Sequence, residues 1–369
     1  LCATALTYFF LDLLIKKIKY KINISDYLIY VLLATVCDVM PLRKLNRLIA
    51  LNALKNFDIT KNLPLSTLFD LNEKKNKINI NDLGYLIGPI LNAGGRLGKS
   101  KYATELLSSN NDQVVKDRSI NLIKLNNKRK EIENLVLNEI DFQIIEKENK
   151  EVIIYYNPNI NEGLIGIIAA RLKDYFNKPS IVITRSNELL KGSARSVYNY
   201  NIGRVIKNSL DKNIIINGGG HNMAAGFTLN KTNLKDFEKY ILEDFLKSNT
   251  VNYNIFAYES EISSFAFNQG FYDNIRKLEP FGTGNSVPSF MLRDLRITKS
   301  IVLNNKHISS ILKSKTGFSI KSISFNSIDT KIGEHLMGYK NSINVIGQIN
   351  ENIWNNKKTL QLTIRDLIL

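Results

Sequence analysis

The sequence predicts an α/β fold made of four consecutive parts: a mainly helical region, a long connector helix, an α/β lobe and a small β-barrel. Apolar residues recur at helical spacing in the first part of the chain. Strand-like and helical segments then alternate, and the last third consists of short alternating runs separated by Asn, Gly and Lys. A chain of 369 residues is also long for a single core, so several domains are expected.

The mainly helical region is predicted over residues 1–110. Apolar side chains recur with helical periodicity over residues 3–19, 26–36 and 44–55. Each of these segments is long enough for several helical turns, so we expect three helices before residue 60.

A single extended helix is predicted to follow, over residues 111–148. The stretch from Val114 to Glu148 is highly charged, contains no proline and keeps apolar residues at helical spacing. Such a polar helix commonly bridges two domains, and we therefore assign this segment to a connector.

The α/β lobe is predicted over residues 149–250. The segments "EVIIYY" (151–156) and "PSIVIT" (179–184) have the composition of buried strands, and the helical "LIGIIAARLKDYF" lies between them. A strand, a helix and a second strand at this spacing indicate a βαβ unit with parallel strands.

The β-barrel is predicted over residues 251–369. Runs such as "RITKSIVL", "FSIKSISF" and "TLQLTIRDL" read as five or so short strands, which are typical of a small antiparallel barrel. Those small barrels that bind oligonucleotides combine a basic groove with aromatic stacking, and Phe318, Phe325 and Trp354 are the candidates for that role. The alternative for each of them is a place in the core.

The composition favours a polyanionic partner in a reducing compartment. Lys and Arg outnumber Asp and Glu by 50 to 34, a net charge of +16, which points to nucleic acid; a merely basic protein is the alternative. Cys2 and Cys37 form neither a disulfide framework nor a zinc motif, so a cytoplasmic setting is expected. The longest apolar run near the start, "LTYFFLDLLI", is too short to span a bilayer, and no membrane association is expected.

A carboxylate in the first part of the chain is placed to bind a metal ion. In "ATVCDVMPL" (34–42), Asp38 follows an apolar stretch and precedes a proline. Carboxylate oxygens at such a position suit Mg²⁺ or Mn²⁺. The alternative is an aspartate that caps a helix or shapes a turn.

Two segments have the residue types of a phosphate site. In "GPILNAGGRLG" (88–98), Gly94 and Gly95 are expected to expose backbone N–H groups beside the guanidinium of Arg96. In "KGSARS", Ser193 and Arg195 lie two residues apart, so on an extended segment both face the same way and suit one phosphate. A helix–loop–helix junction and an exposed strand edge are the respective alternatives.

A glycine-rich segment contains one of the three histidines of the chain. In "NGGGHNMAAGF" (217–227), consecutive glycines precede His221 and small residues follow it. Glycines let a ligand or another backbone come close. The alternative is a glycine turn between two core strands, with His221 buried and satisfied.

Six segments taken together resemble the RecJ family of DHH phosphoesterases. They are "ATVCDVMPL", "GPILNAGGRLG", "LIGIIAARL", "KGSARS", "GGGHNMAAGF" and "LEPFGTGN", and they occur in this order. The C-terminal "INENIWNNKKTLQLTIRDL" also looks like the end of that family's oligonucleotide-binding barrel, so the resemblance covers almost the whole chain.

The resemblance implies a DHH lobe, a DHHA1 lobe and an OB-type barrel that together degrade single-stranded DNA from its 5′ end, with two Mn²⁺ or Mg²⁺ ions. Asp38 would be a metal ligand and catalytic residue, and His221 would stabilise charge on the scissile phosphate. The glycines would admit the DNA backbone, while the small residues after His221 would pack its supporting helix. The residues implied in substrate-phosphate binding are Arg96, Ser193, Arg195, Gly219 and Gly220.

The chain also departs from that family. An Asp-x-Asp-rich segment, a further Asp and Asp-His-His, which supply most of the metal ligands, precede the matching part and are absent here. The chain begins at Leu1 without a methionine, and Asn161 stands where the family usually has histidine. We therefore expect an N-terminally truncated fragment that binds DNA but hydrolyses it weakly or not at all.

Two alternative functions remain open. One is a DHH-family phosphodiesterase that acts on short oligonucleotides or cyclic dinucleotides, against which the C-terminal barrel argues. The other is a non-catalytic module that binds single-stranded nucleic acid, which the missing ligands favour. The resemblance further implies single-strand-binding protein and a RecQ-type helicase as partners, and a monomer is expected.

Overall fold

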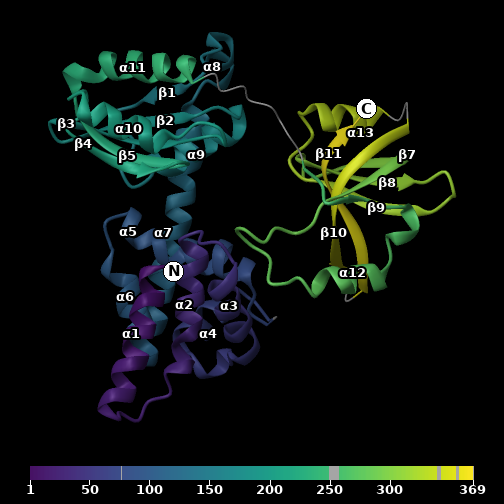
Figure 1. The fold of residues 1–369 in the computed structure, drawn as a ribbon, viewed down its shortest axis with the longest axis horizontal. Coiled ribbons are helices and arrows are strands. Elements are labelled where there is room, and N and C mark those ends of the chain that lie inside the picture. Colours follow the sequence, from purple (N-terminus) through teal and green to yellow (C-terminus); the bar gives the residue numbers. More distant parts are fainter. Residues whose placement is uncertain (76, 249–256, 339–341, 355–356, 369) are drawn as a thin grey trace. The chain divides into compact units, whose positions relative to one another are not determined.

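The structure, a computed structural model, describes residues 1–75, 77–248, 257–338, 342–354 and 357–368 (Figure 1). It divides into two compact units. The first unit combines residues 1–57 with residues 254–369, and the second contains residues 58–253. The finer division predicted at residues 110, 148 and 250 stays a prediction. None of the described helices is long and apolar enough to cross a membrane.

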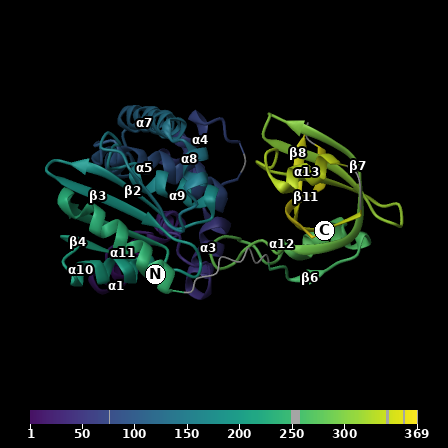
Figure 2. The same ribbon diagram turned by 90° about the horizontal axis from the view of Figure 1, so that it is seen from above.

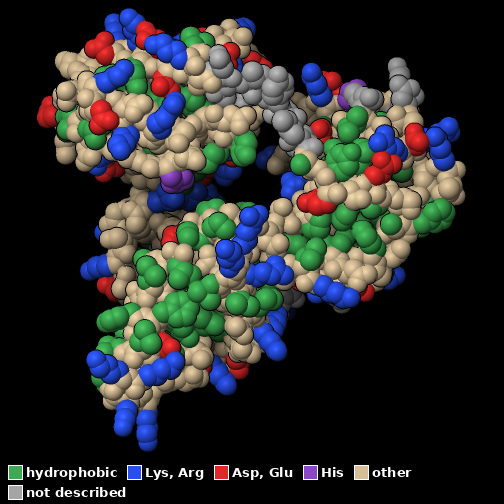
Figure 3. Space-filling model, viewed as in Figure 1, with side chains coloured by type: hydrophobic (Ala, Val, Ile, Leu, Met, Phe, Trp, Pro, Cys, Tyr) green, Lys and Arg blue, Asp and Glu red, His purple; other side chains and the backbone are tan. Residues whose placement is uncertain are grey.

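The first unit begins with the three predicted helices, α1 (Ala3–Ile18), α2 (Leu28–Cys37) and α3 (Lys44–Asn56), with a short 3-10 turn (Ile24–Tyr27) before α2. They pack through a small core that includes Ala5, Val31 and Ile49. Much of the apolar surface of α1 is exposed, and Figure 3 shows apolar side chains gathered over this part of the chain. The exposed apolar residues of α1 are Leu6, Phe10, Leu11, Leu13, Leu14 and Ile18.

The rest of the first unit is the predicted barrel. Its strands run in the order β10-β11-β9-β8-β7-β6, and β10 also pairs with β7, which closes the barrel. Most pairs are antiparallel as predicted, whereas β9–β11 and β6–β7 are parallel. The elements are β6 (Ser260–Glu261), a 3-10 turn (Ser264–Ala266), α12 (Gln269–Arg276), β7 (Phe290–Leu303), β8 (His307–Lys313), β9 (Ser319–Ser324), α13 (Lys331–Gly338), β10 (Ser342–Trp354) and β11 (Lys357–Ile368).

The second unit begins with helices, and here one prediction is wrong. The extended helix expected to reach Glu148 ends at Glu139, and a separate helix begins after Asp141. The Asp141 carboxylate accepts a hydrogen bond from the Ile144 N–H at 3.0 Å, so it caps a new helix and does not continue the old one. The elements are a 3-10 turn (Ile59–Lys61), α4 (Leu63–Leu71), a π-helical turn (Asp82–Ile87), α5 (Gly88–Arg96), α6 (Lys101–Ser108), α7 (Asp112–Glu139) and α8 (Phe142–Glu148).

A five-stranded sheet follows in the order β1-β2-β3-β5-β4. The first two strands are parallel and flank a helix, which confirms the predicted βαβ unit; the other pairs are antiparallel. The elements are β1 (Ile153–Tyr156), α9 (Ile165–Phe176), β2 (Ser180–Ser186), β3 (Leu189–Arg195), α10 (Ile202–Asp211), β4 (Asn217–His221), β5 (Ala224–Asn230), a 3-10 turn (Lys231–Asn233) and α11 (Leu234–Lys247).

Helices cover both faces of this sheet. Helices α10 and α11 pack on one face through residues such as Val205 and Phe237, and α9 packs on the other through Ile168 and Leu172. Figure 2 shows these two layers on opposite sides of the sheet. The small residues after His221 lie on strand β5, and Ala225 among them is buried in the same core cluster as Val205 and Ile206 of α10.

Candidate phosphate-binding site

Strand β3 presents a hydroxyl and a guanidinium on one face of the sheet. Gly192 and Ala194 are buried, whereas Ser193 and Arg195 between them are partly exposed, as the period of two predicts. The Arg195 guanidinium donates hydrogen bonds to the Ser193 hydroxyl at 3.3 Å and to the Ala194 carbonyl at 2.9 Å. The two predicted residues therefore act as one group.

The start of α9 lies directly against this pair. A Cβ on Gly166 would lie 2.9 Å from Nη2 of Arg195 and 3.1 Å from Oγ of Ser193, so only a residue without a side chain leaves them room. A Cβ on Gly163 would lie 2.3 Å from the carbonyl oxygen of Arg96. The Arg96 guanidinium in turn donates a hydrogen bond to the Gly163 carbonyl at 3.1 Å. The turn that begins α9 thus holds both arginines.

Arg96 itself comes from the last residue of α5. Gly94 and Gly95 precede it inside the same helix. Their backbone N–H groups therefore serve the helix, and the expected cradle of free glycine N–H groups is wrong. This segment therefore contributes the guanidinium of Arg96 to the site, and not the backbone N–H groups of its glycines.

The two guanidinium groups carry uncompensated charge. Burial lowers the pKa of Arg96, and the neighbouring Arg129 cation lowers this pKa further, although Glu133 acts in the opposite direction. Burial likewise lowers the pKa of Arg195, and the charge of Arg96 adds to that effect. Among the residues that the structure describes, no carboxylate lies within ion-pair distance of Arg96 or Arg195. Two partly buried cations that repel each other favour the binding of an anion.

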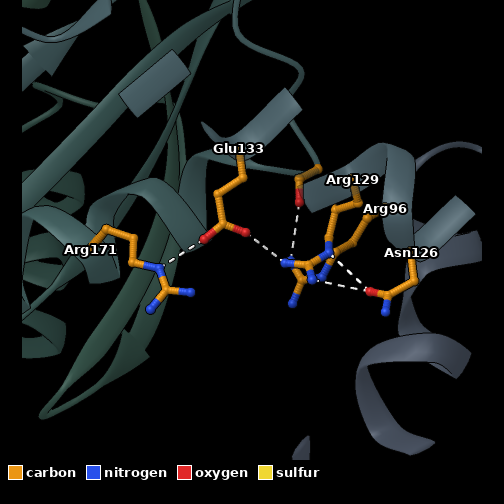
Figure 4. A network of polar contacts seen from close by, with 6 residues as sticks. Arg96, Asn126, Arg129, Glu133 and Arg171 are labelled. Carbon is orange, nitrogen blue, oxygen red and sulfur yellow. Dashed lines mark hydrogen bonds and ion pairs between the residues drawn. The ribbon is translucent and has the colours of Figure 1, made fainter. Parts of the chain in front are cut away.

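A buried carboxylate next to this site forms ion pairs with two further arginines. Glu133 of α7 accepts a hydrogen bond from Arg129 at 2.7 Å and one from Arg171 of α9 at 2.8 Å (Figure 4). Arg129 also donates to the side-chain oxygen of Asn126 at 3.2 and 3.1 Å. Figure 4 shows the Arg129 guanidinium beside that of Arg96. Glu133 therefore neutralises Arg129 and leaves Arg96 available.

His221 lies in register with Arg195. In the sheet, Arg195 pairs with Ala224, and Ala224 pairs with His221. Residues directly opposite each other point to the same face, so His221 lies two strand spacings, about 10 Å, from Arg195 on that face. The side chain is exposed, so the alternative of a buried, satisfied histidine is wrong.

Glycines keep the sheet open next to Ser193. Ser193 pairs with Gly226, and Gly226 pairs with Gly219, on the same face as Arg195 and His221. A Cβ on Gly219 would meet no atom within 4 Å, which leaves open space above it. Gly220 is exposed in the same edge strand. The structure therefore brings together the predicted residues Arg96, Ser193, Arg195, Gly219, Gly220 and His221.

Asp38 belongs to the other unit. It ends α2, and its side chain is exposed. The adjacent thiol is no nucleophile at neutral pH, because burial raises the pKa of Cys37 to about 11, with a contribution from Asp38. Within the described residues, no group of three or more His, Cys, Asp or Glu side chains could hold a metal ion. The metal-ligand role of Asp38 stays a prediction.

Sequence reasoning missed the residues that support the site. Gly163 and Gly166 follow each other at a spacing of three at the start of a helix, which is a weak signal of close packing. Arg129 and Glu133 lie four residues apart on a helix, a spacing that most often marks an exposed ion pair. Only the fold shows that this pair is buried.

The comparisons with known proteins agree with this architecture. A family model described as the RecJ OB domain matches residues 258–366, and one described as the DHHA1 domain matches residues 149–247. The single-stranded-DNA-specific exonuclease RecJ of Haemophilus influenzae is 31% identical over 346 residues, which cover 87% of this chain and 59% of that protein. The chain belongs to the RecJ family.

Other RecJ proteins extend the match. The RecJ of Bacillus subtilis is 27% identical over 350 residues, 90% of this chain and 43% of that protein. A crystal structure of Thermus thermophilus RecJ in complex with Mn²⁺ superposes with a TM-score of 0.80 and 21% identity, over 94% of this chain and 50% of that one, which shows the shared fold. The chain thus spans about half the length of the RecJ proteins that it matches.

The RecJ OB domain contains the aromatic residues expected to stack on bases. Phe318 is partly buried and packs against the barrel core, whereas the Phe325 side chain is 55% exposed. The side chain of Trp354 lies outside the described residues. Of the two phenylalanines, Phe325 is therefore the one whose ring is largely exposed.

Proposed function

We propose that this RecJ-family chain is the substrate-binding part of an exonuclease that degrades single-stranded DNA from the 5′ end. Arg96, Ser193 and Arg195 hold a phosphate of the strand. His221 stabilises negative charge at the scissile phosphate, and the glycines of β4 let the backbone approach. The observation that carries the proposal is the Arg96–Arg195 pair, which among the described residues has no carboxylate within ion-pair distance.

Divalent metal ions belong to the proposed reaction. Thermus thermophilus RecJ has been solved with Mg²⁺ and with Mn²⁺. We propose the same ions for the whole protein, with the carboxylate of Asp38 as a ligand and catalytic group. The described residues offer no cluster of three or more metal-binding side chains, so by themselves they do not form a two-metal centre.

The chain of 369 residues is therefore proposed to bind single-stranded DNA with little or no hydrolysis. In the cell we propose a monomeric cytoplasmic protein that acts with single-strand-binding protein and a RecQ-type helicase. A phosphodiesterase of short oligonucleotides or cyclic dinucleotides is the less favoured function, because the barrel of residues 258–366 provides a second surface for a longer strand.

The proposal is tested by binding of residues 1–369 to oligo-dT at several salt concentrations. Affinity should fall linearly with the logarithm of salt concentration, because phosphate contacts release counterions. Arg195→Gln should weaken binding by about 10- to 150-fold, the value of a charge-assisted hydrogen bond. Its unfolding free energy should change little, since relief of the buried charge and of the repulsion from Arg96 offsets the loss of two hydrogen bonds.

Arg185→Gln is the matched control. Arg185 is an exposed residue of the neighbouring strand β2, and its guanidinium donates to the Asn187 carbonyl at 3.1 Å. Its loss should change affinity less than threefold. An affinity for oligo-dT that does not depend on salt concentration, or an equal loss of affinity in both variants, would contradict the proposed nucleic-acid binding. Mn²⁺-dependent degradation by residues 1–369 that Asp38→Ala abolishes would contradict the weak activity proposed for this chain.

A further inference from the structure

Two tyrosines in the second unit are exposed to an unusual degree. Tyr85 is 84% exposed and Tyr198 is 90% exposed, more than any other large apolar or aromatic side chain that the structure describes. Leu13, with 68%, comes next. A ring that is almost fully in water gains nothing for the fold, because it buries no apolar area. These two side chains therefore contribute little to stability.

Tyr198 projects from a loop whose backbone is held at both ends. The Ser196 N–H donates to the Met223 carbonyl at 2.9 Å, and the Ser196 hydroxyl donates to the Tyr200 carbonyl at 2.6 Å. Tyr200 is only 1% exposed and anchors the far end of the loop in the core. Tyr198 thus lies three residues after Arg195, on a loop bonded to the turn that follows His221.

Tyr85 lies on the helix that ends in Arg96. The π-helical turn of residues 82–87 leads directly into α5, and π-helical turns are frequent at functional sites. Asp82, which is buried, fixes the start of this turn through an ion pair with Lys74 at 3.1 Å. Tyr85 precedes Arg96 by eleven residues on this continuous helical stretch, which corresponds to about 16 Å along the helix axis.

Each tyrosine therefore lies on a chain segment next to one that carries an arginine: Tyr198 on the loop after β3, and Tyr85 on the turn that leads into α5. We infer that Tyr85 and Tyr198 are stacking platforms for bases of the strand whose phosphate Arg96 and Arg195 hold; this inference rests on the proposed function. Aromatic faces stack on any base, but in a duplex the bases already stack on each other and are paired. Two such platforms beside a phosphate site select an unpaired strand.

The inference is tested with residues 1–369, oligo-dT and an oligonucleotide of the same length made of abasic nucleotides. Tyr198→Ala and Tyr85→Ala should each weaken oligo-dT binding by about 5- to 150-fold, the range for loss of one stacked base. Binding of the abasic strand should not change, because it has phosphates but no bases. Tyr198→Phe and Tyr85→Phe should keep wild-type affinity, since the ring and not the hydroxyl stacks.

Tyr175→Ala is the control variant. Tyr175 is a 64% exposed tyrosine near the end of α9 opposite to Gly166, and its ring contacts Phe142 at 4.7 Å between centroids. Its substitution should leave oligo-dT affinity unchanged. Binding of oligo-dT by the wild-type protein with the expected salt dependence, together with wild-type affinity in both alanine variants, would contradict the stacking role of the tyrosines but not the phosphate site. If wild-type protein does not bind oligo-dT, the proposed function itself fails.

Discussion

At the scale of single residues, Glu133 determines whether a buried arginine is neutralised. The side chains of Glu133 and Arg129 are 6% and 11% exposed. Glu133→Gln keeps the shape of the side chain but removes the charge, so Arg129 stays buried without its carboxylate. Loss of one partner of a buried pair costs about 3–5 kcal/mol. We expect the unfolding free energy, measured in urea, to fall by about this amount.

Arg171→Gln is the control for this effect, because Glu133 also accepts from Arg171. The Arg171 side chain is 58% exposed, so water screens this second ion pair. Its loss should cost about 0–1 kcal/mol. Equal destabilisation by the two variants would contradict the argument that burial, and not the number of ion pairs, makes Glu133 important.

At the scale of secondary-structure elements, the junction between α5 and α9 depends on the absence of a side chain at Gly163. Gly163→Ala places a methyl group against the Arg96 backbone, where a Cβ would lie 2.3 Å from the carbonyl oxygen. Overpacking of this kind costs about 1–3 kcal/mol. It should also weaken oligo-dT binding, because Arg96 and the start of α9 must move apart.

Gly95→Ala provides the matched comparison in the residue before Arg96. A Cβ there meets no atom within 4 Å, and Gly95 lies in a helix. Alanine should therefore stabilise the protein, by up to about 1 kcal/mol. The midpoint temperature of thermal unfolding should fall in Gly163→Ala and rise in Gly95→Ala. A Gly163→Ala protein with wild-type stability and affinity would contradict the argument that this junction has no room for a side chain.

At the scale of the whole molecule, the first unit joins segments that are more than 200 residues apart in the chain. The Leu42 N–H donates to the Thr283 carbonyl at 2.7 Å. Arg43 donates to the Gly284 carbonyl at 2.6 Å and Arg47 to the Glu279 carbonyl at 2.9 Å. The "LEPFGTGN" segment, which sequence analysis left without a role, thus docks just after the Asp38 turn.

Arg47→Ala should loosen this docking. Loss of a hydrogen bond from a charged donor costs about 1.5–3 kcal/mol. We expect faster hydrogen exchange at the Leu42 N–H and a lower unfolding free energy. Arg293→Ala, which removes an exposed ion pair with Glu261, should lower the unfolding free energy much less than Arg47→Ala and leave that exchange unchanged. Unchanged exchange in Arg47→Ala would mean that the arginine does not hold the loop.

Local patterns predicted most of the elements and several site residues. The alternation along β3 was enough to put Ser193 and Arg195 on one face, because the period of a strand is set by its own backbone. The break before Asp141 was missed, since an aspartate that caps a helix and one exposed on a helix look alike in a charged sequence. The exposure of His221 was also undecided, because glycines allow both an edge strand and a buried turn.

The sequence by itself determined the α/β class, the order of the parts, the family resemblance and the residues able to contact phosphate. These follow from periodicity, residue chemistry and motifs, which are local properties of the chain. Only the tertiary structure decided that Arg96 and Arg195 both lie against the start of α9 and that Glu133 is buried in an ion pair with Arg129. Burial and the repulsion of neighbouring charges arise between segments far apart in the chain, so no local pattern contains them.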